Sequence, residues 1–354
     1  MKQSANPVQM LQFITQPAFL VKDGVVTQLN TAANNYQISI GTPILEMIVS
    51  GREEYEAFST GKLYLALKAG RAWVSACDNF HIFCLENSFS SPELRAFALA
   101  AQHLRAPLSN AVFGTEALLQ RDDLEHTDLK EHLSQINKSL YQLIRAVCNM
   151  SDVSQLGLAG NANIQQCNAK YLFSEIFDKA STLTEAAGCS IRFRGLTKDV
   201  ECALDSQLIE RAILNLISNA IKFSPKDGEI SAKLKQNDNR LTLTIENRIQ
   251  DGNFDTYGNA FNRFLREPGI DSGLTGIGLG MSIISRTAAI HGGTLLLNIS
   301  KKGVAKVSVS FPITAGPNTT AKSPIKLLDG YTGGIDSYLI ELSDVLPNKF
   351  YEKT

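Results

Sequence analysis

The stretch DSQLIERAILNLISNAIKFSPKDG, residues 205–228, is the most informative part of the chain. Its apolar residues recur every three or four positions, which predicts an amphipathic helix that ends at Ser224-Pro225. Asn215 and Asn219 are four residues apart, so both amides project from one face of this helix. Two amides, a lysine and an aromatic residue suit a site for hydrated magnesium, phosphate and a nucleotide base. The spacing alone fits an ordinary amphipathic helix with a polar patch equally well.

A glycine-rich motif, GLTGIGLGM at residues 273–281, precedes a second helical sequence, SIISRTAAIHGG. Gly276, Gly278 and Gly280 let backbone amides approach an anion closely, and the N-terminus of the following helix favours phosphate. The motif is not a Walker loop, because no Gly-Lys-Ser or Gly-Lys-Thr follows, and no βαβ unit surrounds it. Alone it fits a flexible loop as well, but beside the first helix it favours a nucleotide site.

Together these motifs resemble the GHKL-type ATP-binding domain of the sensor histidine kinases of two-component systems. NLISNAIKFSP, residues 215–225, is similar to that family's N box. AFNRFLR, residues 260–266, resembles its phenylalanine box, and GIGLGM, residues 276–281, resembles its second glycine box. The resemblance covers about residues 91–313.

The resemblance implies a role for each matched residue. Asn219 would bind Mg²⁺, and Asn215, one helical turn away, would be its catalytic companion beside ATP. Lys222 would meet phosphate and Phe223 would flank the adenine. The three glycines of the second motif would form the hinge of a lid over the triphosphate, and residues 250–277 would be that lid.

The first glycine box of the family is altered here. The strand-like run LTLTIEN places Asn247 where the family has an aspartate that accepts a hydrogen bond from the adenine amino group. Ile249 and Asp251 stand where the family has glycines. A charge-assisted bond of about 1.5–3 kcal/mol becomes a neutral bond of about 0.5–1.5 kcal/mol. The change predicts an affinity for ATP that is weakened about tenfold but not abolished.

The stretch AQHLRAPLS, residues 101–109, resembles the phosphoacceptor motif of the family, which reads His, acid, Leu, Arg, any residue, Pro, Leu. Aligned on LRAPL, Gln102 occupies the phosphoacceptor position and His103 the position of the acid. A glutamine amide is not a nucleophile, because its lone pair is delocalised. His103 is therefore the candidate phosphoacceptor. Its ring would lie roughly 5 Å from the family position, and Pro107 is a plausible source of a compensating distortion.

Residues 91–157 predict an antiparallel helical hairpin whose link is RDDLEHT, residues 121–127. Apolar residues recur at helical spacing on both arms. Those of the second arm are Leu129, Leu133, Ile136, Leu140, Leu143, Val147 and Met150. One hairpin cannot bury both stripes, so we expect a homodimer in which two copies form a four-helix bundle.

The remaining segments complete an α+β multidomain chain. Residues 1–90 combine a hairpin at Asp23-Gly24, a short helix and three later strands, an order that resembles a PAS sensor module. Residues 158–313 predict an α/β sandwich with helices on one face of a mixed sheet. Residues 314–354 begin as a polar linker and end in a run, GGIDSYLIELSDVLPNKFY, that is apolar enough to dock at an unspecified place.

Composition excludes several kinds of partner. The 34 basic and 35 acidic residues give a net charge of −1, so no nucleic-acid partner is predicted. No apolar stretch of 18 residues exists, which predicts no membrane span and a cytoplasmic protein. Six cysteines without a CxxC pair indicate neither a zinc cage nor a disulfide framework. Among the other histidines, His291 is expected to cap carbonyls at a helix end.

Two functions of different kinds fit these observations. The first is a histidine kinase that uses ATP and Mg²⁺ to phosphorylate His103 and passes the phosphoryl group to an aspartate of a response regulator. The alternative is a pseudokinase, a nucleotide-binding signalling scaffold that transfers nothing. Gln102 and Asn247 favour the alternative, whereas the intact N box and second glycine box favour nucleotide binding in both. A related ATPase or serine kinase is a third, less favoured possibility.

Overall fold

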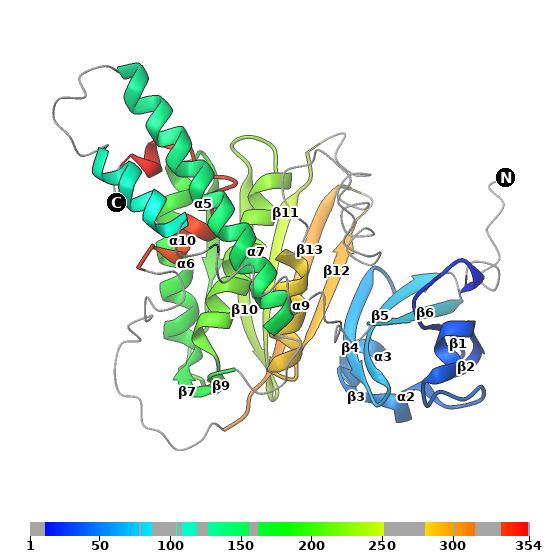
Figure 1. The fold of residues 1–354 in the computed structure, drawn as a ribbon. Coiled ribbons are helices and arrows are strands. Elements are labelled where there is room, and N and C mark those ends of the chain that lie inside the picture. The colour runs from blue at the N-terminus through cyan, green and yellow to red at the C-terminus, as the bar shows by residue number, and fades with distance from the viewer. Residues whose placement is uncertain are drawn as a thin grey trace.

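A computed structural model describes residues 11–77, 79–86, 104, 108–118, 127–155, 162–250, 280–300, 302–315 and 334–352 (Figure 1). Its main feature is a long mixed sheet with helices packed on one face of the C-terminal half. The strand order is β2-β1-β6-β5-β4-β12-β13-β11-β10-β8, and β3 pairs with β4 off this path. The predicted α+β class with a mixed sheet is confirmed.

The N-terminal strands form an antiparallel sheet around their own apolar core. The elements are β1 (Ala18–Lys22), β2 (Val25–Leu29), η1 (Thr31–Asn35), α2 (Ile44–Met47), β3 (Ile48–Ser50), α3 (Arg52–Glu56), β4 (Lys62–Leu67), β5 (Gly70–Cys77) and β6 (Phe80–Leu85). Asp23 and Gly24 both have positive φ and close the predicted hairpin between β1 and β2. Phe19 and Phe83 stack inside the core with ring centroids 4.8 Å apart.

The C-terminal half places three helices over one face of the sheet. The elements are β7 (Gln165–Asn168), α6 (Ala169–Glu185), β8 (Ser190–Arg194), β9 (Glu201–Leu204), α7 (Ser206–Phe223), β10 (Glu229–Asn237), β11 (Arg240–Arg248), α9 (Gly280–Ile290), β12 (Thr294–Ile299) and β13 (Val304–Pro312). Buried and exposed residues alternate along β10, as expected when helices cover a single face. The short β7–β9 pair is a feature that the sequence did not reveal.

Local chemistry sets the two ends of α7. Asp205 is its N-cap, and Asp205 Oδ1 accepts hydrogen bonds from the backbone amides of Gln207 and Leu208. The helix stops at Ser224, one residue before Pro225, where an X-Pro bond disfavours helical backbone. The predicted helix thus forms with the predicted ends.

The two halves share one sheet, because β4 pairs antiparallel with β12. Gly61 enters this junction with φ +90°, and a Cβ there would lie 2.2 Å from the carbonyl oxygen of Leu297. Beside the strands, Glu54 accepts hydrogen bonds from Ser310 Oγ and Arg240 Nη2, at 2.8 and 2.7 Å. The sequence predicted separate modules and gave no sign of this pairing.

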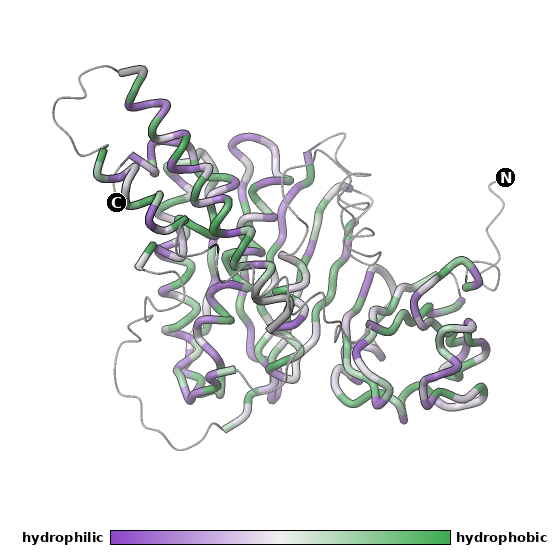
Figure 2. Tube along the Cα trace, in the orientation of Figure 1, coloured by the Kyte–Doolittle hydropathy of each residue, from purple (hydrophilic) through white to green (hydrophobic). Residues whose placement is uncertain are grey.

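A long helix, α5 (Thr127–Gln155), crosses in front of α7 and α9 (Figure 1). Residues 108–118 are helical and contact it, since Thr115 Oγ1 donates to Asn137 Oδ1 and Tyr141 Oη donates to Glu116 Oε1. Hydrophobic and hydrophilic residues alternate along α5 (Figure 2). The predicted hairpin link lies largely outside the described residues. Of the predicted stripe on the second arm, three residues at heptad spacing are about half exposed: Leu129, Ile136 and Leu143.

The C-terminal run docks between α5 and α7. It forms α10 (Ser337–Glu341) and η2 (Asn348–Tyr351), and its residues Tyr338, Leu342 and Leu346 are buried in the main core. Asn137 Nδ2 on α5 donates to the carbonyl oxygen of Tyr351. The sequence predicted that this run docks at an unspecified place, and the structure shows that it packs between α5 and α7.

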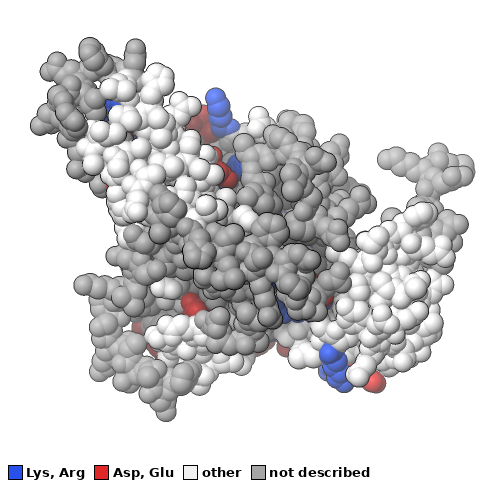
Figure 3. All heavy atoms as spheres, in the orientation of Figure 1, with Lys and Arg blue, Asp and Glu red and all other residues white. Residues whose placement is uncertain are grey.

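On the face drawn in Figure 3, acidic and basic side chains of the described residues are scattered, and no patch of one sign forms there. In the described part of the chain no helix has the length and apolar character needed to cross a bilayer.

Candidate functional site

The candidate site lies where α7 meets the start of α9. Asn215 is fully buried on α7, whereas Asn219, Lys222 and Phe223 are partly buried further along the same helix. Gly280, the first residue of α9, packs so closely that a Cβ there would lie 2.8 Å from Asn215 Oδ1. Asn219 Nδ2 contacts Met281 Sδ at 3.8 Å. The two helices therefore bring the N-box-like motif against Gly280 and Met281, the described end of the glycine-rich motif.

The amide of Asn215 is held by three other residues. Its Nδ2 donates to the backbone carbonyl of Arg211 at 2.9 Å and to Glu341 Oε2 at 3.0 Å. Its Oδ1 accepts a hydrogen bond from Arg145 Nη2 at 3.1 Å. The partners come from three elements, α7 itself, α10 and α5.

Two buried arginines share the carboxylate of Glu341. Arg145 Nε lies 3.3 Å from Glu341 Oε2, and Arg211 Nε lies 3.1 Å from Glu341 Oε1. Arg145 also forms an ion pair with Asp344 at 2.8 Å. Because all three side chains of the Glu341 pairs are more than nine-tenths buried, their charges interact with little screening by water.

Lys222 stands near the same charges. Burial lowers the pKa of Lys222 from its ordinary value, while the nearby Asp344 raises it and Arg145 lowers it further. The tail thus brings an acidic group close to the lysine expected to meet phosphate.

Asn247 connects the sheet to the end of α7. It lies on β11 and is buried, and its Nδ2 donates to Ser224 Oγ and to the carbonyl oxygen of Arg248, both at 3.3 Å. The backbone amide of Gln250 donates to the carbonyl oxygen of Phe223 at 2.9 Å. Asn247 and Phe223 are therefore neighbours at the same end of the site.

Residues 204–315 match the family model described as "Histidine kinase-, DNA gyrase B-, and HSP90-like ATPase". This segment, called the ATPase domain below, is similar to members of that family. The match runs from the end of β9 through α7, α9 and β13, so it contains every described residue of the candidate site except Arg145, Glu341 and Asp344.

Relatives of the chain are sensor histidine kinases. Hybrid signal transduction histidine kinase D of Dictyostelium discoideum is 25% identical over 225 residues, which are 62% of this chain and 14% of that protein. Sensor histidine kinase CusS of Escherichia coli O6:H1 is 25% identical over 233 residues, which are 64% of this chain and 46% of that protein. The chain thus spans less than half the length of either relative. The predicted relationship to sensor histidine kinases is confirmed.

Among solved structures, full-length ShkA in complex with AMPPNP is similar to the chain with 21% sequence identity and a TM-score of 0.48. The similarity covers 63% of this chain and 47% of that one.

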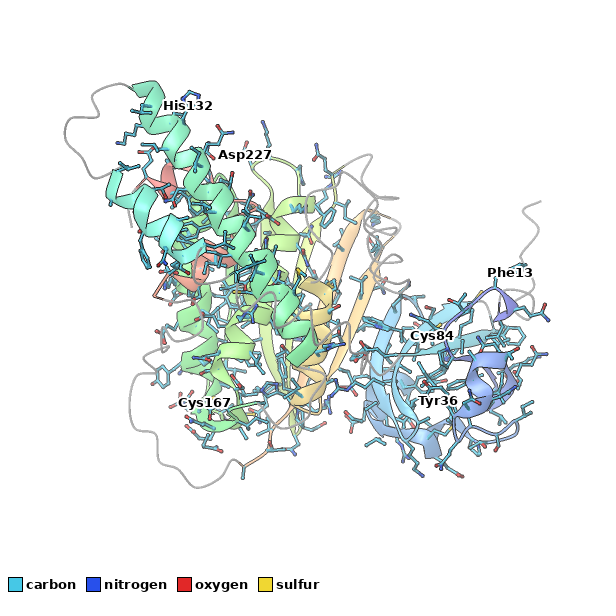
Figure 4. All side chains as sticks on the ribbon, viewed as in Figure 1. Phe13, Tyr36, Cys84, His132, Cys167 and Asp227 are labelled. Carbon is cyan, nitrogen blue, oxygen red and sulfur yellow. The ribbon has the colours of Figure 1, made fainter. Side chains whose placement is uncertain are left out.

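Several predicted site residues lie outside the described residues. They are Gln102, His103, Gly276, Gly278, residues 251–277 of the expected lid and the phenylalanine-box-like segment. The histidine of α5 that the structure does describe, His132, lies near the outer end of that helix (Figure 4).

His291 connects the two helices of the ATPase domain at their far ends. Its Nε2 accepts a hydrogen bond from the backbone amide of Asp205 at 2.9 Å, and its Nδ1 donates to the carbonyl oxygen of Thr287 at 2.8 Å. Burial lowers the pKa of His291, in keeping with a neutral ring. The expected carbonyl cap is confirmed, and the bond to Asp205 is an addition.

The network of Arg145, Arg211 and Glu341 was missed by sequence reasoning. Two signals pointed toward it: Arg211 stands one helical turn before Asn215, and Glu341 is a single acid inside the apolar run SYLIEL. A charged residue in an apolar run is a candidate for a buried pair, but the sequence did not identify its partners.

Proposed function

We propose that the protein is a sensor histidine kinase. It binds ATP in the ATPase domain, phosphorylates a histidine of the hairpin, and passes the phosphoryl group to an aspartate of a response regulator. The observation that carries this proposal is the contact between the amide-bearing face of α7 and Gly280 at the start of α9, inside a segment that matches the ATPase family. The relationship to sensor histidine kinases supports the choice of a histidine as the acceptor.

The described residues suit the parts of a nucleotide. The N-terminus of α9, which follows the glycine motif, would face phosphate because its amides and dipole favour an anion. Lys222 would neutralise phosphate charge, and the partly buried ring of Phe223 would flank the base. Asn247 uses its amide nitrogen within the protein, so its Oδ1 would accept the bond from the adenine amino group.

Asn219 is the residue that would hold Mg²⁺. Its amide oxygen is a hard donor of the kind that Mg²⁺ prefers, and its Nδ2 is directed to Met281, which turns Oδ1 to the opposite side. Asn215 fits this role less well, because its Oδ1 lies 3.1 Å from a guanidinium nitrogen of Arg145, which would repel a cation. Bound Mg²⁺ would supply neutralisation of the phosphate charges.

The hairpin would supply both the acceptor and the dimer contact. His103 is the proposed phosphoacceptor, one position from the family slot at Gln102. The half-exposed residues Leu129, Ile136 and Leu143 repeat every seven positions on α5, which supports pairing with a second copy.

The proposal is tested by incubating the full chain with ATP labelled at the γ-phosphate. We expect an acid-labile label that is lost in His103→Gln and retained in His132→Gln, a matched control elsewhere in the hairpin. Gln102→His, which restores the family slot, should increase the label. A wild-type chain that binds nucleotide but takes up no label would contradict the proposal, and an acid-stable label would indicate a hydroxyl acceptor instead.

A further inference from the structure

One carboxylate from the C-terminal tail joins three groups around the nucleotide helix. Glu341, which is 2% exposed, is the last residue of α10. Its two oxygens contact Arg145 on α5 and both Arg211 and Asn215 on α7, at 3.0 to 3.3 Å. The tail lies outside the segment that matches the ATPase family, residues 204–315.

We propose that Glu341 is a positioning residue of the nucleotide site. It fixes the amide of Asn215, and through that amide it sets how the start of α9 packs on α7. The inference rests on the proposed binding of a nucleotide between these two helices.

The amide of Asn215 has one favourable orientation in this network. Its Nδ2 faces the carboxylate of Glu341 and its Oδ1 faces the guanidinium of Arg145. A flipped amide would place its oxygen against the carboxylate and its N–H groups against the cation, and both contacts would be repulsive. The charges of Glu341 and Arg145 therefore lock the side chain.

The oxygen of this fixed amide, Asn215 Oδ1, packs against the first residue of α9. A Cβ at Gly280 would lie 2.8 Å from Asn215 Oδ1, so any side chain at this position would require the amide of Asn215 to shift. Met281, the next residue, contacts Asn219, the proposed ligand of Mg²⁺. A shift of the Asn215 amide would therefore be passed directly to the phosphate-facing end of α9.

The charge balance also depends on Glu341. Arg145 has a second carboxylate partner in Asp344, and direct bonds from Arg145 to Asn215 and from Arg211 to Asn149 also join α5 with α7. Glu341 is the carboxylate that pairs with both arginines. Glutamine at this position keeps the volume and removes the charge. Residues that orient the groups contacting a metal or substrate typically contribute about tenfold to a hundredfold to affinity or activity.

The test compares Glu341→Gln, Glu341→Asp and Glu352→Gln in the full chain. Glu352 is a matched control, because it lies on the same tail in a partly exposed ion pair with Lys130. Binding of a fluorescent, non-hydrolysable ATP analogue with Mg²⁺ and hydrogen exchange of residues 280–290 without nucleotide are measured. We expect both Glu341 variants to bind at least about tenfold more weakly and to exchange faster in α9. Glu352→Gln should match the wild type.

Three results would overturn the proposal. Unchanged binding by Glu341→Gln would remove the positioning role, and tighter binding would mean that the tail competes with nucleotide. Wild-type behaviour of Glu341→Asp would mean that charge alone matters and position does not. If the wild type binds no nucleotide, the proposed function fails, but the exchange of α9 still tests the role of Glu341.

A measurement on the wild type covers the case in which the Glu341 variants do not fold. Coupling between two sites is reciprocal, so a tail that positions the nucleotide site is itself stabilised by nucleotide. Addition of ADP and Mg²⁺ should slow hydrogen exchange in residues 337–342. Exchange that does not change while ADP is bound would overturn the inference.

Discussion

The two flanking segments of the ATPase domain attach to it in different ways. The N-terminal unit joins mainly through backbone, because β4 extends the sheet at β12, and the side chain of Glu54 adds bonds to Ser310 and Arg240. The tail joins through side chains, because one buried carboxylate meets two arginines and an asparagine. The backbone junction lies at β12, whereas the tail reaches α7 itself (Figure 1). We infer that the β4–β12 pairing positions the N-terminal unit, whereas the Glu341 network sets the geometry of the nucleotide site.

The largest loss of stability is expected when the network around Glu341 loses one of its charges. Arg211→Met removes one cation from Glu341 but leaves Arg145 in place. Breaking a buried pair on one side typically costs about 3–5 kcal/mol, and the remaining arginine places this variant near the lower value. Urea denaturation followed by circular dichroism measures the free energy of unfolding. A loss below about 1 kcal/mol would mean that the network contributes little to stability.

A smaller loss of stability is expected when the β4–β12 junction is disturbed. Gly61→Ala places a Cβ against the carbonyl oxygen of Leu297 and imposes a left-handed conformation on alanine. Together these effects should lower the free energy of unfolding by about 2–3 kcal/mol. Gly41→Ala is the matched control, because Gly41 has nearly the same φ, +92°, with nothing within 4 Å of its Cβ. Hydrogen exchange should rise in β4 and β12 of the first variant only. Equal effects of the two substitutions would refute the close-contact explanation.

The smallest effect on folding is expected on the face of α5 that neither attachment covers. Ile136 is half exposed, so Ile136→Lys should change the free energy of unfolding of a single chain by no more than about 0.5 kcal/mol. In the proposed dimer the same lysine would be buried in the four-helix bundle. Sedimentation should therefore show a dimer for the wild type and a monomer for the variant. A dimer in both would place the interface elsewhere.

The helices and strands of the ATPase domain could be predicted because local signals agreed with one another. Asp205 caps α7, Pro225 follows its end, and β10 and β11 alternate apolar and polar residues. The N-box-like spacing also placed Asn215 and Asn219 on one helix, where the structure has them. These features are set by residues that lie close together in the sequence, so they could be predicted from the sequence alone.

Long-range pairing could not be predicted in the same way. The β4–β12 junction depends on two strand edges far apart in the chain, and neither edge has a signature of its partner. Glu341 likewise meets Arg145 and Arg211 only after the tail has folded back on α5 and α7. A lone acid in an apolar run indicated burial, but the partner of a buried charge is fixed by tertiary structure.

The comparison of the two attachments is tested most directly by the dissociation constant of the Mg²⁺-bound ATP analogue in Glu341→Gln and Gly61→Ala, measured side by side in the full chain. We predict weakening of at least about tenfold in Glu341→Gln and a change below about twofold in Gly61→Ala. The reverse order, with the sheet junction controlling affinity and the tail carboxylate without effect, would contradict the account.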